Sequence, residues 1–178
     1  MRPSISVNTD ALPAGLACLL CLLALLAPAG AQTITERAER DEISIMPSED
    51  PAMRRAFEQA RGTLDWFLAR ASSPPAGTTG YALKVAVSDG RGTEYFWVNR
   101  FVADGNRFTG YLGNEPRLVK KYKFDEQFAF DREQIVDWIY IDTNSRRMRG
   151  NYTACALLTK EPAAQAEAFK QRYGLSCE

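Results

Sequence analysis

The hydrophobic pattern of this 178-residue chain changes its period once, and that change limits the folds open to it. Across residues 53–71 apolar side chains recur every three or four positions, which is typical of an amphipathic helix. Ser48 and Asp50 are candidate N-cap residues, and Pro51 suits the first helical turn. Two prolines in the segment 72–77 rule out a continuation of the helix, and after them apolar residues alternate as they do in strands.

The alternating segments follow one another through turns, with no helices between them. The expected strands cover residues 82–88, 94–102, 107–112, 128–130, 135–141 and 152–159. A last helix is expected from Pro162 to Tyr173, where Gly174 can end it. Strands that are grouped in this way predict an α+β fold: a mostly antiparallel sheet of about six strands with an N-terminal helix and a C-terminal helix packed on it.

The N-terminal segment has the features of an export signal. Residues 16–27 form an unbroken apolar run of 12, which is too short to span a bilayer as a helix but suits a secretory signal. Small residues at Ala29 and Ala31 have the spacing of a cleavage site. We therefore predict a signal peptide over 1–31, cleavage after Ala31, a periplasmic or secreted location and no stable membrane span after cleavage. An uncleaved anchor stays open, whereas lipidation of a cysteine within the apolar run is disfavoured because apolar residues follow both cysteines.

Beyond the signal, the sequence predicts two further parts. Residues 32–48 are charge-dense and are expected to form a mobile N-terminal arm, whose residues 43–45 can join a sheet edge. Residues 49–178 are expected to form a single α+β domain, since their number suits one hydrophobic core.

Cleavage of the signal would leave two of the four cysteines, Cys155 and Cys177. An even pair in an oxidising compartment predicts a disulfide that ties the C-terminus to the body of the domain. A buried Cys155 with a free, frayed Cys177 is the alternative that the sequence leaves open.

The amino-acid composition excludes several catalytic mechanisms and metal sites. The chain has no histidine, which excludes Ser-His-Asp and Cys-His mechanisms and zinc sites built on histidine. No phosphate-binding glycine loop and no calcium-binding loop is visible, so neither a metal nor a cofactor is expected. Because 22 basic residues balance 22 acidic ones, nucleic acid is not expected as a partner.

A carboxylate mechanism survives these exclusions, because paired acidic side chains can act as general acid and base without histidine. A hydrolase or lyase of this kind is one alternative function. The candidate residues are Glu94, Glu115, Asp125, Asp131 and Asp137.

Aromatic residues are the most suggestive feature of the strands. Alternation places Tyr95, Trp97 and Phe101 on one face of the sheet, and Trp138 and Tyr140 together on one face of a later strand. These rings either form a recognition surface or are buried as ordinary core, and the sequence does not decide between the two.

Five sequence segments, taken in order, resemble those of a known family: DPAMRRAFEQARGTLDWFL, YFWV, FTGYLGNEPRLVK, DWIY and GNYTACALL. The family is the bacterial YegJ-like family, a domain of unknown function, and the resemblance runs from about Asp50 to about Lys160. It implies a compact α+β domain, often behind an export signal. It brings no established activity, ligand or catalytic residue.

Taken together, these features favour a non-catalytic exported module that binds an envelope protein or ligand. A third possibility is an inhibitory or stabilising partner of a larger envelope protein. No catalytic residue is assigned. The residues expected at a binding surface are Trp97, Asn114, Glu115, Asp137, Trp138, Tyr140, Asn151 and Tyr152.

Overall fold

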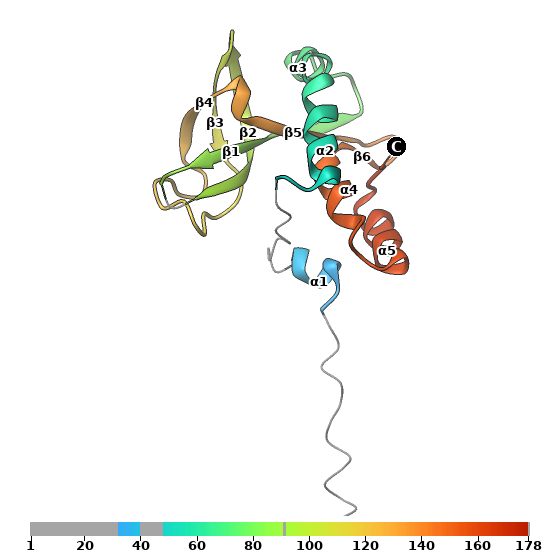
Figure 1. The fold of residues 1–178 in the computed structure, drawn as a ribbon. Helices are drawn as coiled ribbons and strands as arrows, with labels where there is room; N and C mark the ends of the chain where they lie inside the picture. Colours follow the sequence, from blue (N-terminus) through green and yellow to red (C-terminus); the bar gives the residue numbers. More distant parts are fainter. Residues whose placement is uncertain (1–31, 40–47, 91, 178) are drawn as a thin grey trace, which may run out of the picture. The chain divides into compact units, whose positions relative to one another are not determined.

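A computed structural model describes residues 32–39, 48–90 and 92–177 of the chain. Its helices are α1 (Ile34–Glu39), α2 (Pro51–Gly62), α3 (Leu64–Ser72), α4 (Tyr152–Leu158) and α5 (Ala163–Tyr173) (Figure 1). Its strands are β1 (Thr78–Ser88), β2 (Thr93–Asp104), β3 (Arg107–Leu112), β4 (Gln127–Asp131), β5 (Ile135–Asp142) and β6 (Arg147–Gly150), and a 3-10 turn covers Arg132–Gln134.

The six strands form one sheet in the order β4-β3-β2-β1-β5-β6, and every neighbouring pair is antiparallel. The predicted α+β class is therefore confirmed, with N-terminal helices and C-terminal helices packed on the sheet. Directly opposed residues share a face. One face accordingly carries Leu83 with Val98 and Trp138, and the other carries Lys84 with Trp97 and Asp137.

The main core lies on the Leu83 face of the sheet. Its largest fully buried side chains come from β1 to β4 and from α3, and they include Phe67, Phe96, Phe108 and Phe130. Smaller apolar clusters join α2 to α4 through Met53, Ala56 and Ala156, and join α1 to α5. In Figure 1, α2 and α4 accordingly lie side by side next to β5.

The predicted N-terminal helix is in fact two helices, and this part of the prediction is wrong. The chain leaves helical geometry at Thr63, where φ is −109° and ψ is 1°. Thr63 donates its hydroxyl hydrogen to the carbonyls of Gln59 and Ala60 and accepts a hydrogen bond from the indole nitrogen of Trp138. The apolar period is uninterrupted at this position, because Ala60, Leu64 and Phe67 are all buried, so the sequence pattern did not reveal the break.

The segment expected as the last strand, residues 152–159, is helix α4, and the last strand β6 lies in what was expected to be a turn and its flank. Gly150 (φ 78°) and Asn151 (φ 56°) are both left-handed, which ends the strand and starts the helix. A seven-residue apolar segment is too short for its period to distinguish helix from strand, which explains the error.

The face assigned to Phe101 is also wrong. Arg100 adopts φ 48° at an irregularity in the pairing of β2 with β3. A bulge shifts the alternation by one residue, so Phe101 turns to the core face and lies 6.0 Å from the Phe67 ring. Trp138 and Tyr140 do share a face, but they are only 3% and 6% exposed.

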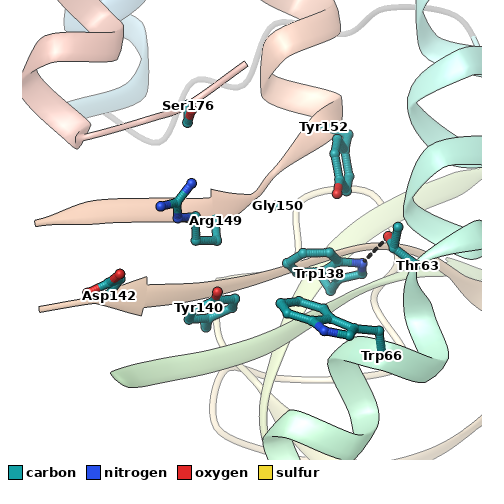
Figure 2. A pocket seen from close by; sticks show the side chains of 9 residues that line it. All are labelled: Thr63, Trp66, Trp138, Tyr140, Asp142, Arg149, Gly150, Tyr152 and Ser176. Carbon is teal, nitrogen blue, oxygen red and sulfur yellow. Dashed lines mark hydrogen bonds between the residues drawn. The ribbon is translucent and has the colours of Figure 1, made fainter. Parts of the chain in front are cut away.

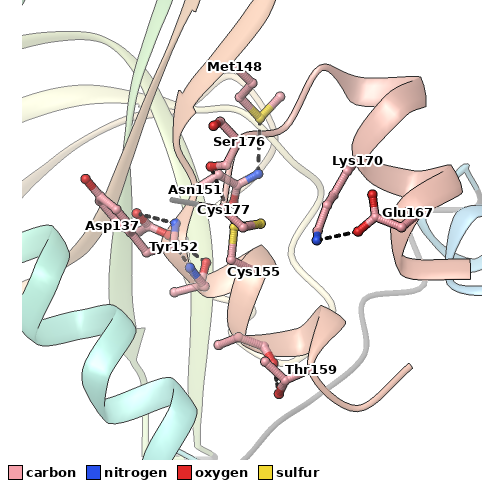
Figure 3. Close-up of a disulfide and its surroundings, with 12 residues drawn as sticks. Asp137, Met148, Asn151, Tyr152, Cys155, Thr159, Glu167, Lys170, Ser176 and Cys177 are labelled. Carbon is pink, nitrogen blue, oxygen red and sulfur yellow. Dashed lines mark hydrogen bonds and ion pairs between the residues drawn. A yellow bond between two sulfur atoms is a disulfide. The ribbon is translucent and has the colours of Figure 1, made fainter. Parts of the chain in front are cut away.

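The C-terminal region agrees with its prediction. Helix α5 ends at Gly174, which is left-handed, and Leu175 then pairs with Met148 in a parallel bridge. Cys155 and Cys177 form the predicted disulfide, with their Cα atoms 5.6 Å apart (Figure 3). The open alternative of a free Cys177 is therefore not what the structure contains.

The start of the predicted arm is helical. Thr33 and Glu36 hydrogen-bond each other's backbone N–H groups as a capping box, and Ile34 is buried against α5. Residues 43–45 and the predicted signal peptide over 1–31 lie outside the described residues, so the division into signal, arm and domain stays a prediction. Among the described residues, no helix is long and apolar enough to cross a membrane.

Candidate functional site

A pocket of about 410 Å³ lies on the Trp138 face of the sheet, beside α3, β5, β6 and the C-terminal segment (Figure 2). We call it the aromatic pocket. Its lining residues are Thr63, Trp66, Trp138, Tyr140, Asp142, Arg149, Gly150, Tyr152 and Ser176.

Two rings of β5 form the floor of the aromatic pocket. Trp138 and Tyr140 are two residues apart, so they point to the same side, and their rings are nearly parallel with centroids 6.2 Å apart. Each ring is stacked on a core ring: Phe67 lies 4.9 Å from Trp138, and Tyr81 lies 5.3 Å from Tyr140. The Trp138 indole also donates to Thr63, so the floor is held in position before any ligand binds.

Trp66 of α3 forms the exposed wall of the pocket. It is 53% exposed, and its ring lies 5.8 Å from Trp138 and 6.1 Å from Tyr140. The guanidinium of Arg70 lies 5.5 Å from the Trp66 ring and 5.1 Å from the Tyr140 ring, a cation–π arrangement. An indole this exposed, at the rim of a concave site, is available to a ligand.

Several polar groups around the pocket make no hydrogen bond within the described part of the chain and are open to solvent, because the one buried side-chain nitrogen or oxygen without a partner there is Nε of Arg70. They are the hydroxyls of Tyr140, Tyr152 and Ser176, the indole N–H of Trp66 and the guanidinium of Arg149. Asp142 differs from them, because it accepts hydrogen bonds from the backbone of Ser145 and Asn144. These bonds, both of which reach Oδ1, together with the nearby Arg149 charge lower the pKa of Asp142, so it is an ionised turn residue.

Gly150 allows β6 to approach the floor closely. Its φ is 78°, and a Cβ atom at this position would lie 2.1 Å from the carbonyl oxygen of Trp138 and 2.5 Å from its ring. Only glycine fits both the conformation and the space.

The opposite face of β5 carries a buried polar cluster, which we define as Lys84, Asp137 and Thr153. One oxygen of Asp137 accepts hydrogen bonds from the N–H groups of Trp138 (2.8 Å) and Tyr152 (3.2 Å). The other accepts from the N–H (2.8 Å) and the hydroxyl (2.7 Å) of Thr153. Because Tyr152 and Thr153 open α4, Asp137 caps that helix from a neighbouring strand (Figure 3).

Lys84 completes the polar cluster. Its ammonium donates to the Thr153 hydroxyl at 2.9 Å and lies 5.1 Å from the Trp97 ring. The Lys84 residue as a whole is half-buried, but its ammonium is enclosed by these groups. The hydroxyl therefore accepts from Lys84 and donates to Asp137, which leaves no unpaired polar atom in the cluster.

Burial acts on both charges of the cluster. It raises the pKa of Asp137, while Lys84 and the donated hydrogen bonds act in the opposite direction. Burial also lowers the pKa of Lys84, against the effect of Asp137. Since all four groups that contact Asp137 donate to it, the ionised carboxylate is the form that satisfies them.

The structure divides the predicted binding residues between these two places. Trp138, Tyr140 and Tyr152 line the aromatic pocket. Asp137 belongs to the polar cluster, and Trp97 adjoins it. The Asn114 side chain accepts a hydrogen bond from the backbone N–H of Trp97 at 3.0 Å.

The last two predicted residues contribute indirectly or not at all. Asn151 donates its N–H to the carbonyl of Trp138 and its side-chain amide to the sulfur of Met148 (Figure 3). Glu115 is exposed and lines neither the pocket nor the cluster.

Sequence reasoning missed Trp66, Arg149 and Ser176 as pocket residues and Lys84 as the partner of Asp137. Trp66 could have been found, because it falls on the polar side of the helical pattern, where an indole is unusual. Arg149 and Ser176 reach the site through the pairing of β6 with β5 and through the disulfide, which no local pattern indicates.

The five candidate carboxylates do not form an acid–base pair. Glu94 accepts from three consecutive backbone N–H groups, at residues 117–119. Asp125 pairs with Arg100, and Asp131 caps the 3-10 turn. Asp137 is buried in the polar cluster, and Asp142 is the only acidic residue among those lining the aromatic pocket.

Neither a metal cluster nor a second aromatic site is evident in the described ranges. They contain no group of three or more histidine, cysteine, aspartate or glutamate side chains that could hold a metal. Another cavity of about 450 Å³ lies between α2 and α4, where alanine and leucine side chains alternate with polar ones, and Tyr152 is its one aromatic residue. Its Lys170 is already paired with Glu167 at 2.8 Å.

Comparison with known proteins gives a family but no activity. The sequence profile of the family described as "Uncharacterized protein conserved in bacteria (DUF2314)" matches residues 50–177. The uncharacterized protein YegJ of Escherichia coli (strain K12) is 28% identical over 121 residues, which cover 68% of this chain and 76% of YegJ. No solved structure matches. The predicted resemblance over about 50–160 is thus confirmed, and the family match extends beyond it through helix α5 to residue 177.

Proposed function

The chain belongs to the DUF2314 family of uncharacterized bacterial proteins, and we propose that it is an exported, non-catalytic module that binds a ligand of the cell envelope in the aromatic pocket. Export is the part of this proposal that rests on sequence. The apolar run over 16–27 and the small residues before Gln32 suit a cleaved signal, and the Cys155–Cys177 disulfide suits an oxidising compartment.

One observation supports binding at this pocket above all others. Buried polar groups of a folded protein are normally hydrogen-bonded, yet Nε of Arg70, whose guanidinium lies over the pocket rings Trp66 and Tyr140, is buried without a partner among the described residues. Around the pocket, hydroxyl, indole and guanidinium groups converge on one space without partners among the described residues, beside an exposed indole. A concave site with an aromatic wall and a few convergent polar groups has the composition of a small-molecule site.

Catalysis gains no support from the same pocket. Its one carboxylate, Asp142, is held by the backbone of a turn, and its pKa is lowered, whereas a general acid needs a raised one. The carboxylate-dependent hydrolase or lyase is therefore the weaker proposal.

A second candidate is the inhibitory or stabilising partner of a larger envelope protein. It is favoured by three exposed apolar side chains that do not line the aromatic pocket: Val102 (66% exposed), Phe124 (58%) and Leu118 (42%). Large exposed apolar side chains are common at protein interfaces, although scattered ones also occur on ordinary surfaces.

Native mass spectrometry tests the proposed function. The full chain, expressed with its own N-terminal segment and purified, is incubated with soluble fragments released from bacterial envelopes. A bound small molecule is expected, and it should be lost in Trp66→Ala while Phe124→Ala, which removes an equally exposed ring elsewhere, retains it. Absence of any bound species, or a species that survives Trp66→Ala, would contradict the proposal. A large protein ligand that is lost only in Phe124→Ala would favour the second candidate.

A further inference from the structure

The groups around the aromatic pocket restrict the ligand further, and we infer that it is a sugar ring that carries a carboxylate. This inference rests on the proposed function, because it assigns a chemical class to the ligand of the same site. The residues that restrict the ligand are Trp66, Trp138, Tyr140, Arg149, Tyr152 and Ser176.

A sugar ring fits the aromatic and hydroxyl groups together. Its C–H face is apolar and can lie on an exposed aromatic ring, here Trp66, beside the edges of Trp138 and Tyr140. Its hydroxyls both donate and accept hydrogen bonds, as do the unpaired hydroxyls of Tyr140, Tyr152 and Ser176. A wholly apolar ligand would bury these groups without partners, which is unfavourable.

A carboxylate on the ring fits Arg149. This residue lies directly opposite Tyr140 in the pairing of β5 with β6, so its side chain is on the pocket side of the sheet. Its guanidinium makes no hydrogen bond or ion pair in the described ranges, although its charge acts on the nearby carboxylate of Asp142. A guanidinium in this state suits a carboxylate, which it can bind through two parallel hydrogen bonds.

The positive charges argue against the other common ligand of aromatic sites. Clusters of aromatic rings bind quaternary ammonium groups. Here the Arg70 guanidinium already lies over Trp66 and Tyr140, and together with Arg149 it gives the pocket two positive charges against the one negative charge of Asp142, so a cationic ligand would be disfavoured. An anionic ligand has favourable electrostatics in the same place.

A matched pair of sugars tests the inference. N-acetylmuramic acid is N-acetylglucosamine with a lactyl ether that carries a carboxylate, so the two probes differ only in that group. Titration of the full chain by isothermal calorimetry should show N-acetylmuramic acid binding at least about tenfold more tightly, the effect of a charge-assisted hydrogen bond. Lactate alone, which lacks the ring, should bind more weakly than either sugar.

Two variants locate the effect. Arg149→Gln should bring the affinities of the two sugars to within about twofold of each other, whereas Arg54→Gln, which removes an exposed arginine of α2, should leave the tenfold preference intact. Trp66→Ala should weaken both sugars. Circular dichroism checks that each variant is folded.

The outcomes separate this inference from the proposed function. Equal affinity for the two sugars in the unmodified protein, a preference that survives Arg149→Gln, or no binding of either sugar overturns the carboxylate-sugar ligand. If an envelope fragment is nevertheless bound and lost in Trp66→Ala, the binding function stands with a ligand of another class. If no envelope fragment is bound either, both proposals fail.

Discussion

The two faces of strand β5 differ in how their polar groups are hydrogen-bonded. On one face, Asp137 accepts four hydrogen bonds and shares the Thr153 hydroxyl with Lys84, so every polar atom of the cluster has a partner. On the other, Arg149 and several hydroxyls surround the aromatic pocket without partners in the described ranges. A buried network in which each polar atom has a partner indicates packing, whereas convergent, solvent-accessible polar groups beside an exposed ring indicate recognition.

Tyr152 links the two faces. Its N–H donates to Asp137, while its ring lies edge-on to Trp138, with centroids 5.4 Å apart, and lines the aromatic pocket. The polar cluster thereby sets the position of a pocket wall without itself lining the pocket. This division of roles leads to predictions that differ sharply between the two faces.

The largest loss of stability is expected from Asp137→Ala. Four donors would lose their common acceptor and the buried Lys84 ammonium would lose its nearby opposite charge, which should lower the free energy of unfolding by about 3–5 kcal/mol. Urea denaturation followed by circular dichroism measures this loss. Glu115→Ala, an exposed carboxylate in neither site, is the control and should change stability by less than about 0.5 kcal/mol.

Lys84 and Asp137 can be tested together in a double-mutant cycle. If Lys84 and Asp137 stabilise each other, Lys84→Met with Asp137→Ala should cost less than the sum of the two single changes. Strict additivity would show that the polar cluster does not act as a unit.

Removal of the disulfide is expected to have the next largest effect. The bond joins residues 22 positions apart, so Cys155→Ala with Cys177→Ala should lower the free energy of unfolding by about 3 kcal/mol. Since the bond also holds Ser176 at the pocket wall, affinity for the envelope ligand should fall. Unchanged affinity in the folded variant would remove Ser176 from the site.

Two glycine substitutions test the close approach of β6 to the pocket floor. Gly150→Ala forces a Cβ against the Trp138 carbonyl at a positive φ and should destabilise the protein by about 1–3 kcal/mol. Gly62→Ala, at a helical position with open space around it, should instead stabilise by about 0.5–1 kcal/mol. Thermal unfolding of both variants measures the difference, and a tolerated Gly150→Ala would contradict the close approach of β6 to the pocket floor.

The smallest effect concerns acid stability away from both faces. The hydrogen bond from Lys160, and then that from the Ala52 N–H, lower the pKa of Asp50, the N-cap of α2. A lowered folded-state pKa contributes stability above the unfolded pKa, and this contribution is lost as the pH falls through the folded value. Asp50→Asn keeps a capping oxygen but not the charge. Its deficit relative to the unmodified protein, measured by urea midpoints, should therefore shrink between about pH 5 and pH 2, and a constant deficit would contradict the assignment.

The fold was predictable where periodicity was long and unbroken. The meander of β1 to β3, the core face through Leu83 and Phe96, and helix α5 up to Gly174 all follow from patterns of several residues. Prediction failed where one backbone conformation decided the outcome, as at Arg100, where a left-handed residue reverses the alternation.

The candidate site was predictable only in part, for a related reason. The β5 residues Asp137, Trp138 and Tyr140 come from one phrase of the sequence, and their order already places the carboxylate opposite the two rings. The cationic residue of each face comes from a neighbouring strand: Lys84 of β1 belongs to the polar cluster, and Arg149 of β6 lines the aromatic pocket. Pairing across the sheet brings them together, and no local pattern encodes that register.

Ligand retention by two variants tests the assignment of roles most directly. Trp66→Ala and Lys84→Met are each incubated with the envelope fragments, and bound ligand is measured by native mass spectrometry alongside the free energy of unfolding. We predict that Trp66→Ala loses the ligand with a stability loss of about 1 kcal/mol or less, because half of its side chain is exposed and the rest contacts the rings of Trp138 and Tyr140, whereas Lys84→Met keeps the ligand and is less stable by about 1–3 kcal/mol. Loss of the ligand in Lys84→Met together with retention in Trp66→Ala would contradict the account and place recognition on the opposite face of β5.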